Sequence, residues 1–177
     1  NERFTKAILE KDKKTQLNEI NVRVTMGADL SKPDVDAMNG LARAIVSLFD
    51  ERAKKETYLE SVMQRHCPNI TILAGATIAA RLLREAGSLR RLATIQASTI
   101  QLYGAEKALF RHLKTGARPP KHGHIINHPL VSQAKPKDKG KVSRALADKI
   151  SIAAKVDFFK GDPIGARLKK DLEVRFS

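Results

Sequence analysis

The chain has 177 residues, of which 33 are Lys or Arg and 19 are Asp or Glu, giving a formal net charge of +14. This length allows one sizeable domain or a domain with an extension. The charge is uneven, because residues 104–177 carry 17 basic and 7 acidic side chains, whereas residues 1–103 carry 16 and 12. Positive charge concentrated in one half indicates a polyanionic partner such as nucleic acid, and a generally basic soluble surface is the plainer alternative.

The composition also excludes several classes of site. Cys67 is the only cysteine, so an internal disulfide and a multi-cysteine zinc site are ruled out, and a reduced, intracellular setting fits. No apolar run approaches the ~18–20 residues that cross a bilayer. Asn1 opens no signal peptide, and the absence of an initiating Met indicates a fragment.

The first predicted element is a helical hairpin over residues 1–67. Residues 1–25 are charged and weakly periodic, and Ser31, Pro33 and Asp34 form a helix-start signal. The apolar positions that follow alternate by three and four residues, which predicts an a/d seam and an antiparallel coiled-coil hairpin. The alternative is an amphipathic helix packed on a globular core. The positions of the seam are Met38, Leu41, Ile45, Leu48, Leu59 and Val62.

Residues 68–177 are predicted to form a compact all-α domain. Pro68 ends the preceding helix, and Asn69 is predicted to cap a helix that continues to Gly87. Short helices are expected near residues 88–92 and between Gly104 and Gly116. Four prolines predict a loop over residues 117–136. A long helix should follow from residue 138 or 140, and a last one after residues 161–163.

The segment after Tyr103 has the strongest functional signal. Lys107, Arg111 and Lys114 are spaced by four and three residues and therefore share one helical face. The helix begins at Gly104, where free backbone N–H groups and the helix dipole favour a phosphate. Leu109, Phe110 and Leu113 are expected to pack on the opposite side. A merely solvated charged face is the alternative.

The loop beyond this helix contributes three imidazoles, His122, His124 and His128, among Lys and Pro residues. A zinc site would need a further ligand that the loop does not supply, so flat surfaces for an unstacked base are the favoured interpretation. No nucleophile has an evident base beside it, and no phosphate-cradling glycine motif occurs. The sequence therefore predicts a binding protein without catalytic residues, metal or cofactor.

Many short blocks in one order give the chain a family resemblance. Residues 69–160 resemble the Nop domain of box C/D ribonucleoprotein core proteins, most closely the archaeal members, and residues 22–66 resemble the second arm of that family's coiled-coil hairpin. Gln96 departs from the family's usual proline before Ala-Ser-Thr, which puts the local turn in doubt. The blocks include Ala97-Ser-Thr-Ile-Gln101, Gly104-Ala-Glu-Lys-Ala-Leu-Phe110, Pro120-Lys-His-Gly123 and Ala153-Ala-Lys-Val-Asp157.

The resemblance implies a scaffold that assembles box C/D guide particles for RNA 2′-O-methylation. Its implied partners are a box C/D guide RNA with a kink-turn, the small ribosomal-family protein bound to that RNA, and a second copy through the coiled coil. Fibrillarin would be recruited through an N-terminal domain that this chain lacks. Carried over by position, His128 is implied to stack on a base. The implied RNA- or RNP-binding residues are Gly104, Ala105, Glu106, Lys107, Arg111, Lys114, Lys121, His124, His128, Lys141 and Arg144.

Two other interpretations stay open. The chain resembles, more distantly, a spliceosomal factor that would bind a small nuclear RNA–protein complex, or it acts mainly as a coiled-coil dimerisation module. The expected location is the cytoplasm of an archaeal cell, or the nucleolus in a eukaryote.

Overall fold

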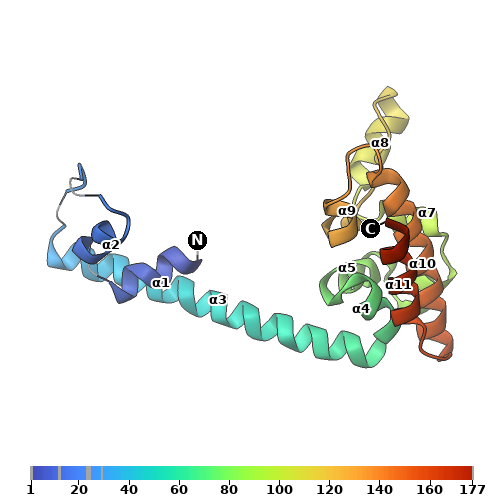
Figure 1. The fold of residues 1–177 in the computed structure, drawn as a ribbon, viewed down its shortest axis with the longest axis horizontal. Helices are drawn as coiled ribbons and strands as arrows, with labels where there is room; N and C mark the ends of the chain where they lie inside the picture. Colours follow the sequence, from blue (N-terminus) through green and yellow to red (C-terminus); the bar gives the residue numbers. More distant parts are fainter. Residues whose placement is uncertain (1, 12, 23–24, 29, 177) are drawn as a thin grey trace. The chain divides into compact units, whose positions relative to one another are not determined.

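The structure, a computed structural model, describes residues 2–11, 13–22, 25–28 and 30–176, and Asn1 lies outside these ranges. Every regular element within them is a helix, as predicted (Figure 1). The chain divides into two compact units, Asn1–Thr57 and Tyr58–Ser177. Within the described ranges, no helix combines the length and the apolar character that a membrane crossing requires.

The first unit contains α1 (Glu2–Glu10), α2 (Lys13–Glu19) and most of α3 (Lys32–His66). The predicted helix start is confirmed, because α3 begins at Lys32, directly after Ser31, and the Ser31 hydroxyl donates to the Asp34 carboxylate in the first turn. The predicted seam is divided between two faces of α3. Ile45 is partly buried, whereas Leu41 and Leu48 are 65% and 71% exposed. A helix with apolar residues on two faces can contact two neighbours.

The second unit starts inside α3. Leu59 and Met63, on the last turns of that helix, pack into the core formed by the following helices. The prediction placed a boundary after Cys67, at the end of the helix. The compact units divide ten residues earlier, because side-chain packing, rather than a helix end, decides which unit a residue joins.

The helix predicted from Asn69 to Gly87 is two helices, α4 (Pro68–Ala74) and α5 (Ala76–Ala86). They meet at Gly75, whose φ of 79° and ψ of 151° are not helical. The run of small residues there made a continuous helix plausible from the sequence. Asn69 is also not the N-cap, because α4 already begins at Pro68 and Cys67 occupies the cap position.

The centre of the second unit is α10 (Lys139–Phe159), which starts after Asp138 as predicted. It contacts α4, α6 (Leu89–Thr94), α7 (Ala97–Leu102) and α11 (Gly165–Phe176). Ala147, Ala153 and Ala154 are fully buried on α10. Small side chains allow neighbouring helices to approach closely, so one helix can support several others.

A buried polar network holds α10, α4 and the start of α11 together. The Asp157 carboxylate accepts hydrogen bonds from the backbone N–H groups of Asn69 (3.0 Å) and Ile70 (2.9 Å) and from the Asn69 side-chain amide (2.7 Å). The Asn69 side-chain oxygen in turn accepts from the N–H groups of Ile164 and Gly165, both at 2.8 Å. Asp157 therefore satisfies N–H groups at the first turn of α4, which otherwise have no partner within that helix.

Contrary to the prediction of a continuous loop, the prolines of residues 117–136 leave room for short helical turns. The segment contains the short 3₁₀ helix η1 (His124–Asn127) and the single turn α9 (Pro129–Ser132). Pro129 stands at the first position of α9, where a missing N–H costs nothing. The preceding helix, α8 (Glu106–Thr115), ends at Gly116 with a φ of 68°, as predicted.

Candidate nucleic-acid interface

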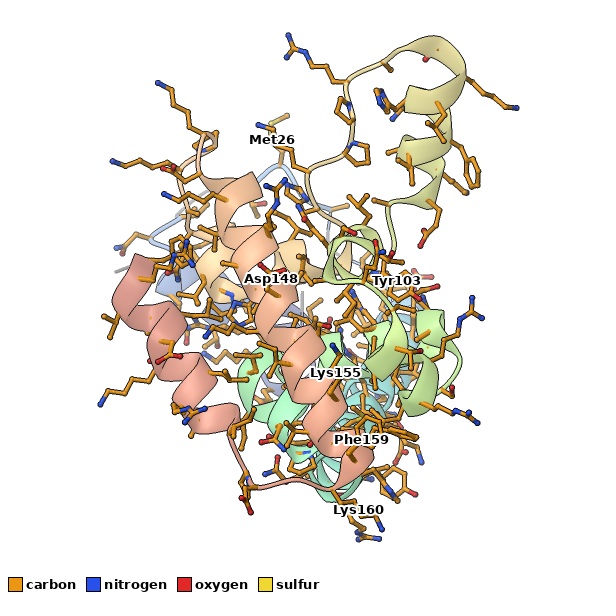
Figure 2. The ribbon with its side chains drawn as sticks, turned by 90° about the vertical axis from the view of Figure 1, so that its right-hand side faces the viewer. Met26, Tyr103, Asp148, Lys155, Phe159 and Lys160 are labelled. Carbon is orange, nitrogen blue, oxygen red and sulfur yellow. The ribbon has the colours of Figure 1, made fainter. Side chains whose placement is uncertain are left out.

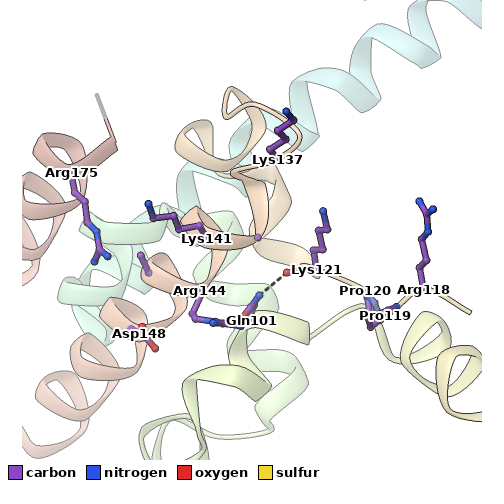
Figure 3. A pocket seen from close by; sticks show the side chains of 12 residues that line it. Gln101, Arg118, Pro119, Pro120, Lys121, Lys137, Lys141, Arg144, Asp148 and Arg175 are labelled. Carbon is purple, nitrogen blue, oxygen red and sulfur yellow. Dashed lines mark hydrogen bonds between the residues drawn. The ribbon is translucent and has the colours of Figure 1, made fainter. Parts of the chain in front are cut away.

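Six cationic side chains surround an open groove of about 660 Å³ in the second unit (Figure 3). They come from three separate parts of the chain: the loop after α8, the N-terminal turns of α10 with the residues just before it, and α11. All six are exposed, and among the described residues none of them makes an ion pair. The six are Arg118, Lys121, Lys137, Lys141, Arg144 and Arg175.

One wall of the groove is held by a hydrogen bond between a side chain and the loop backbone. The Gln101 side chain on α7 donates to the Lys121 carbonyl at 2.6 Å, which holds the loop against that helix (Figure 3). Lys141 and Arg144 lie one turn apart on α10 and therefore share a face. The lining contains one carboxylate, that of Asp148. The groove is strongly positive and suits the phosphates of a polyanion.

The loop beside the groove is clasped to the junction between α7 and α8. The N–H groups of Gly123 and His124 donate to the carbonyls of Gln101 (2.8 Å) and Tyr103 (2.7 Å). A Cβ at Gly123 would lie 1.9 Å from the Tyr103 carbonyl oxygen, so only glycine allows this approach. These contacts hold the loop that forms the groove wall directly against the start of α8.

Gly104 is constrained by both its backbone and a neighbour. Its φ is +88°, and a Cβ there would lie 2.5–2.7 Å from the ring atoms of His124. The Glu106 carboxylate accepts a hydrogen bond from the Gly104 N–H at 2.8 Å. That N–H is consequently occupied, so in this structure the predicted phosphate donor at Gly104 is directed to a side chain of its own helix.

The position of His124 in the basic loop suggested that its ring meets phosphate. In the structure the ring instead packs at the α7–α8 junction. The His124 side chain is 18% exposed, and its Nε2 lies 3.0 Å from the Glu85 carboxylate. Glu85 also forms an ion pair with Arg84. The pKa of the Glu85 carboxyl is lowered, mainly by the hydrogen bond from Arg84 and to a smaller extent by the one from His124. The imidazole lies between Glu85 on α5 and Gly104 and contacts both elements.

Replacing Gly104 by Ala tests this packing. We expect the free energy of unfolding to fall by about 2–3 kcal/mol, because the side chain adds both left-handed strain and a clash with the ring. Gly116→Ala is the matched control, since Gly116 also has a positive φ but a Cβ added there would meet no atom within 4 Å. It should cost only about 1 kcal/mol in urea denaturation. Equal losses for the two variants would contradict a clash with His124.

Lys107, Arg111 and Lys114 form the exposed basic face of α8, which has no buried residue. Phe110 and Leu113 are 61% and 70% exposed, which corrects the prediction that they pack inward. Figure 1 shows the reason, since α8 extends away from the other helices of the second unit. The helix therefore offers a partner both cations and an aromatic ring.

His128 is also placed differently from the prediction. The family resemblance implied that its ring stacks on a base, but the side chain is buried, with 8% of the residue exposed. Nδ1 accepts from the Leu130 N–H at 3.3 Å, so Nε2 carries the proton and donates to the Leu73 carbonyl at 3.1 Å. Burial lowers the pKa of His128 and keeps the ring neutral. It caps α9 and has no free face for a base.

The structure thus gathers part of the predicted set. Lys121, Lys141 and Arg144 meet at the groove, while Gly104, Ala105, Glu106, Lys107, Arg111 and Lys114 form the adjoining junction and helix. His124 and His128 are structural. Sequence reasoning did not single out Arg118, Lys137 or Arg175, which also line the groove. Arg175 lies on α11, and no local pattern could show which helix face reaches α10.

Two further observations bear on metal binding and on the reactivity of Cys67. In the part of the chain that the structure describes, no three His, Cys, Asp or Glu side chains lie close enough to hold a metal ion. Burial, with a smaller contribution from the Asp157 charge, raises the pKa of the Cys67 thiol to about 11. A protonated, buried thiol is a poor nucleophile.

The structure defines a helical domain with a groove lined by cations, and comparisons with known proteins give its family. The family model described as "Nop: snoRNA binding domain, fibrillarin" matches residues 1–177. A NOP5 family protein of Methanocaldococcus jannaschii is 46% identical over 151 residues, which are 85% of this chain and 36% of that protein. Nucleolar protein 56 of Saccharomyces cerevisiae is 42% identical over 158 residues, 88% of this chain and 31% of that protein. The chain belongs to the Nop family.

A solved structure agrees with this assignment. A chain in the crystal structure of a fibrillarin/Nop5p complex is 31% identical, with a TM-score of 0.61 over 99% of this chain and 63% of that chain. The present chain spans about a third of the length of the two relatives named above. The similarity therefore covers only that part of those proteins that corresponds to this chain.

Proposed function

We propose that this protein is an RNA–protein scaffold that docks on a kink-turn RNA with its bound ribosomal-family protein and assembles box C/D guide particles for 2′-O-methylation. The relatives are named as NOP5 family and nucleolar proteins, and the solved relative is in a complex with fibrillarin. Fibrillarin would be recruited by a domain outside this chain. The proposed location is the archaeal cytoplasm, or the nucleolus if the source is a eukaryote.

The observation that carries this proposal is the groove with six exposed cations and one carboxylate. Phosphates would supply sequence-independent attraction there. Helix α8 begins at the α7–α8 junction beside the groove. Its exposed basic and apolar faces would contact RNA that is already covered by the small protein. Recognition of two components together explains how a charged surface selects one site among many RNAs.

A gel-shift with labelled kink-turn RNA tests the proposal. The RNA is used alone and after addition of its small ribosomal-family protein, and a duplex of equal length without a kink is the control. We expect a shift at least tenfold tighter for the preassembled complex than for either RNA alone. Equal affinity for the complex and the plain duplex would contradict the composite site and leave only non-specific RNA binding.

A second role, self-association through α3, is favoured by one observation in the first unit. Ala37, Leu41, Ala44 and Leu48 are spaced by four, three and four residues and are all exposed. This spacing puts them on one stripe, as in the a and d positions of a coiled coil. We therefore include a second copy of the chain among the proposed partners, with this stripe as the contact.

The stripe can be tested by introducing charge. We expect Leu41→Glu combined with Leu48→Glu to convert a dimer into a monomer in sedimentation equilibrium, because two carboxylates would be buried without partners. Val174→Glu is the control, since Val174 is 75% exposed on α11. A dimer that persists in the double variant would place the contact elsewhere. Kink-turn binding that persists in the monomeric variant would separate the two roles, whereas a dimer that does not bind the kink-turn complex would favour a module whose main role is dimerisation.

A further inference from the structure

The outer face of α10 continues beyond the groove. Lys141 and Arg144, which line the groove, are followed at helical spacing by Asp148, Ile152, Lys155 and Phe159, and all six are exposed. Figure 2 shows Asp148, Lys155 and Phe159 in line along the helix, with Lys160 at its end. One uninterrupted track therefore leads from the groove to the far end of α10.

The far end of this track has the composition of a surface for single-stranded nucleic acid. Phe159 is 72% exposed and Ile152 is 43% exposed. The cations Lys155 and Lys160 flank the ring, and among the described residues neither makes an ion pair. Aromatic rings between cations bind single strands by stacking bases while the cations meet the backbone.

The Phe159 ring is also held in place. Its centroid lies 4.9 Å from that of Phe158 with an interplanar angle of 74°, an edge-on contact. Phe158 itself packs against the core. A ring oriented by a core neighbour loses little further freedom when a base stacks on it, which favours binding.

We propose that the outer face of α10 binds a single-stranded extension of the RNA held in the groove, with Phe159 stacking on one base and Lys155 and Lys160 meeting its backbone. This inference rests on the proposed function, because the strand starts from RNA in the groove. The charge of the track and its continuity with the groove favour RNA over a protein as the occupant. Lys141 and Phe159 are 18 residues apart on α10, hence about 27 Å, which corresponds to about eight nucleotides at the ~3.4 Å spacing of a stacked strand.

The test compares two forms of one RNA in fluorescence anisotropy at fixed salt. One is a kink-turn RNA with its ribosomal-family protein, and the other is the same complex with an eight-nucleotide single strand added at its 5′ or 3′ end. We expect one of the extensions to tighten binding by about fivefold or more, the gain that one stacked base provides. Phe159→Ser should remove that gain and leave the affinity for the unextended complex unchanged. Val174→Ser, which removes an exposed apolar side chain on α11, should leave both affinities unchanged.

The outcomes separate this inference from the proposed function. If the unextended complex binds and neither extension changes its affinity, the inference is overturned while the proposed function stands. If Phe159→Ser instead weakens the unextended complex, the ring contacts the protein component or the folded RNA, and the single-strand assignment is wrong. If neither complex binds, the proposed function itself fails. Lys155→Glu should reproduce the loss of the gain, and Lys170→Glu on α11 should not.

Discussion

Replacing Asp157 by Ala is expected to lower the free energy of unfolding by about 3 kcal/mol or more. The substitution leaves two backbone N–H groups and one side-chain amide near the start of α4 without their acceptor. Each buried donor without a partner costs roughly 1–3 kcal/mol. Urea denaturation followed by circular dichroism at about 222 nm measures the change, because helix is the signal that unfolding removes.

Two variants make this prediction specific. Asp162→Ala removes an exposed carboxylate from the loop after α10 and should change stability by no more than about 0.5 kcal/mol. Asp157→Asn keeps the shape and one acceptor oxygen, so an intermediate loss is expected. If Asp157→Ala were as mild as Asp162→Ala, water or another group would have to satisfy the α4 donors, and the network would not hold the helices together.

Reversing two charges in the groove should have the largest effect on binding. We expect Lys141→Glu with Arg144→Glu to weaken binding to the preassembled kink-turn complex by about a hundredfold at about 0.1 M salt, because each lost phosphate contact costs about one decade there. The slope of log affinity against log salt should also become shallower by about two contacts. For the unchanged protein, about six contacts predict roughly a thousandfold loss between about 50 and 200 mM salt.

The matched control is Arg167→Glu with Lys170→Glu. It makes the same change in net charge on exposed positions of α11 that do not line the groove. A hundredfold loss in this control as well would mean that net charge, rather than the groove, governs binding. Affinity of the unchanged protein that does not respond to salt would remove phosphate attraction from the explanation altogether.

The helical class and many helix ends could be predicted because they depend on local chemistry. Ser88 caps α6 by accepting from the Arg91 N–H, and Gly87 and Gly116 end their helices in the left-handed conformation. The break at Gly75 was not predicted, because a glycine within a helical pattern is often tolerated. The carboxylate that caps α4 comes from Asp157, 88 residues away, and no local signal reveals such a partner.

The basic groove could be predicted in part, because its charge follows from the pattern of Lys and Arg in the sequence. Lys121, Lys141 and Arg144 belong to segments that the sequence already marked as basic, and the structure brings them to one groove. The histidines show where this reasoning stops. A His in a loop can be exposed or can serve as a hydrogen-bonding core group, and His128 became the latter through the Leu73 carbonyl. That contact crosses 55 residues, so only the fold could reveal it.

The Asn69 network has a consequence for the order of folding during synthesis. The groups that complete the start of α4 lie 87 to 96 residues later in the chain. Contacts so distant in sequence form slowly, since a long loop must close first. While a ribosome makes this protein, the first turn of α4 therefore lacks its Asp157 acceptor, and Asn69 lacks the N–H donors of Ile164 and Gly165, until the α10 and α11 segments have emerged. Apolar core residues such as Ile70 stay uncovered for that interval, a period in which nascent chains are prone to aggregate.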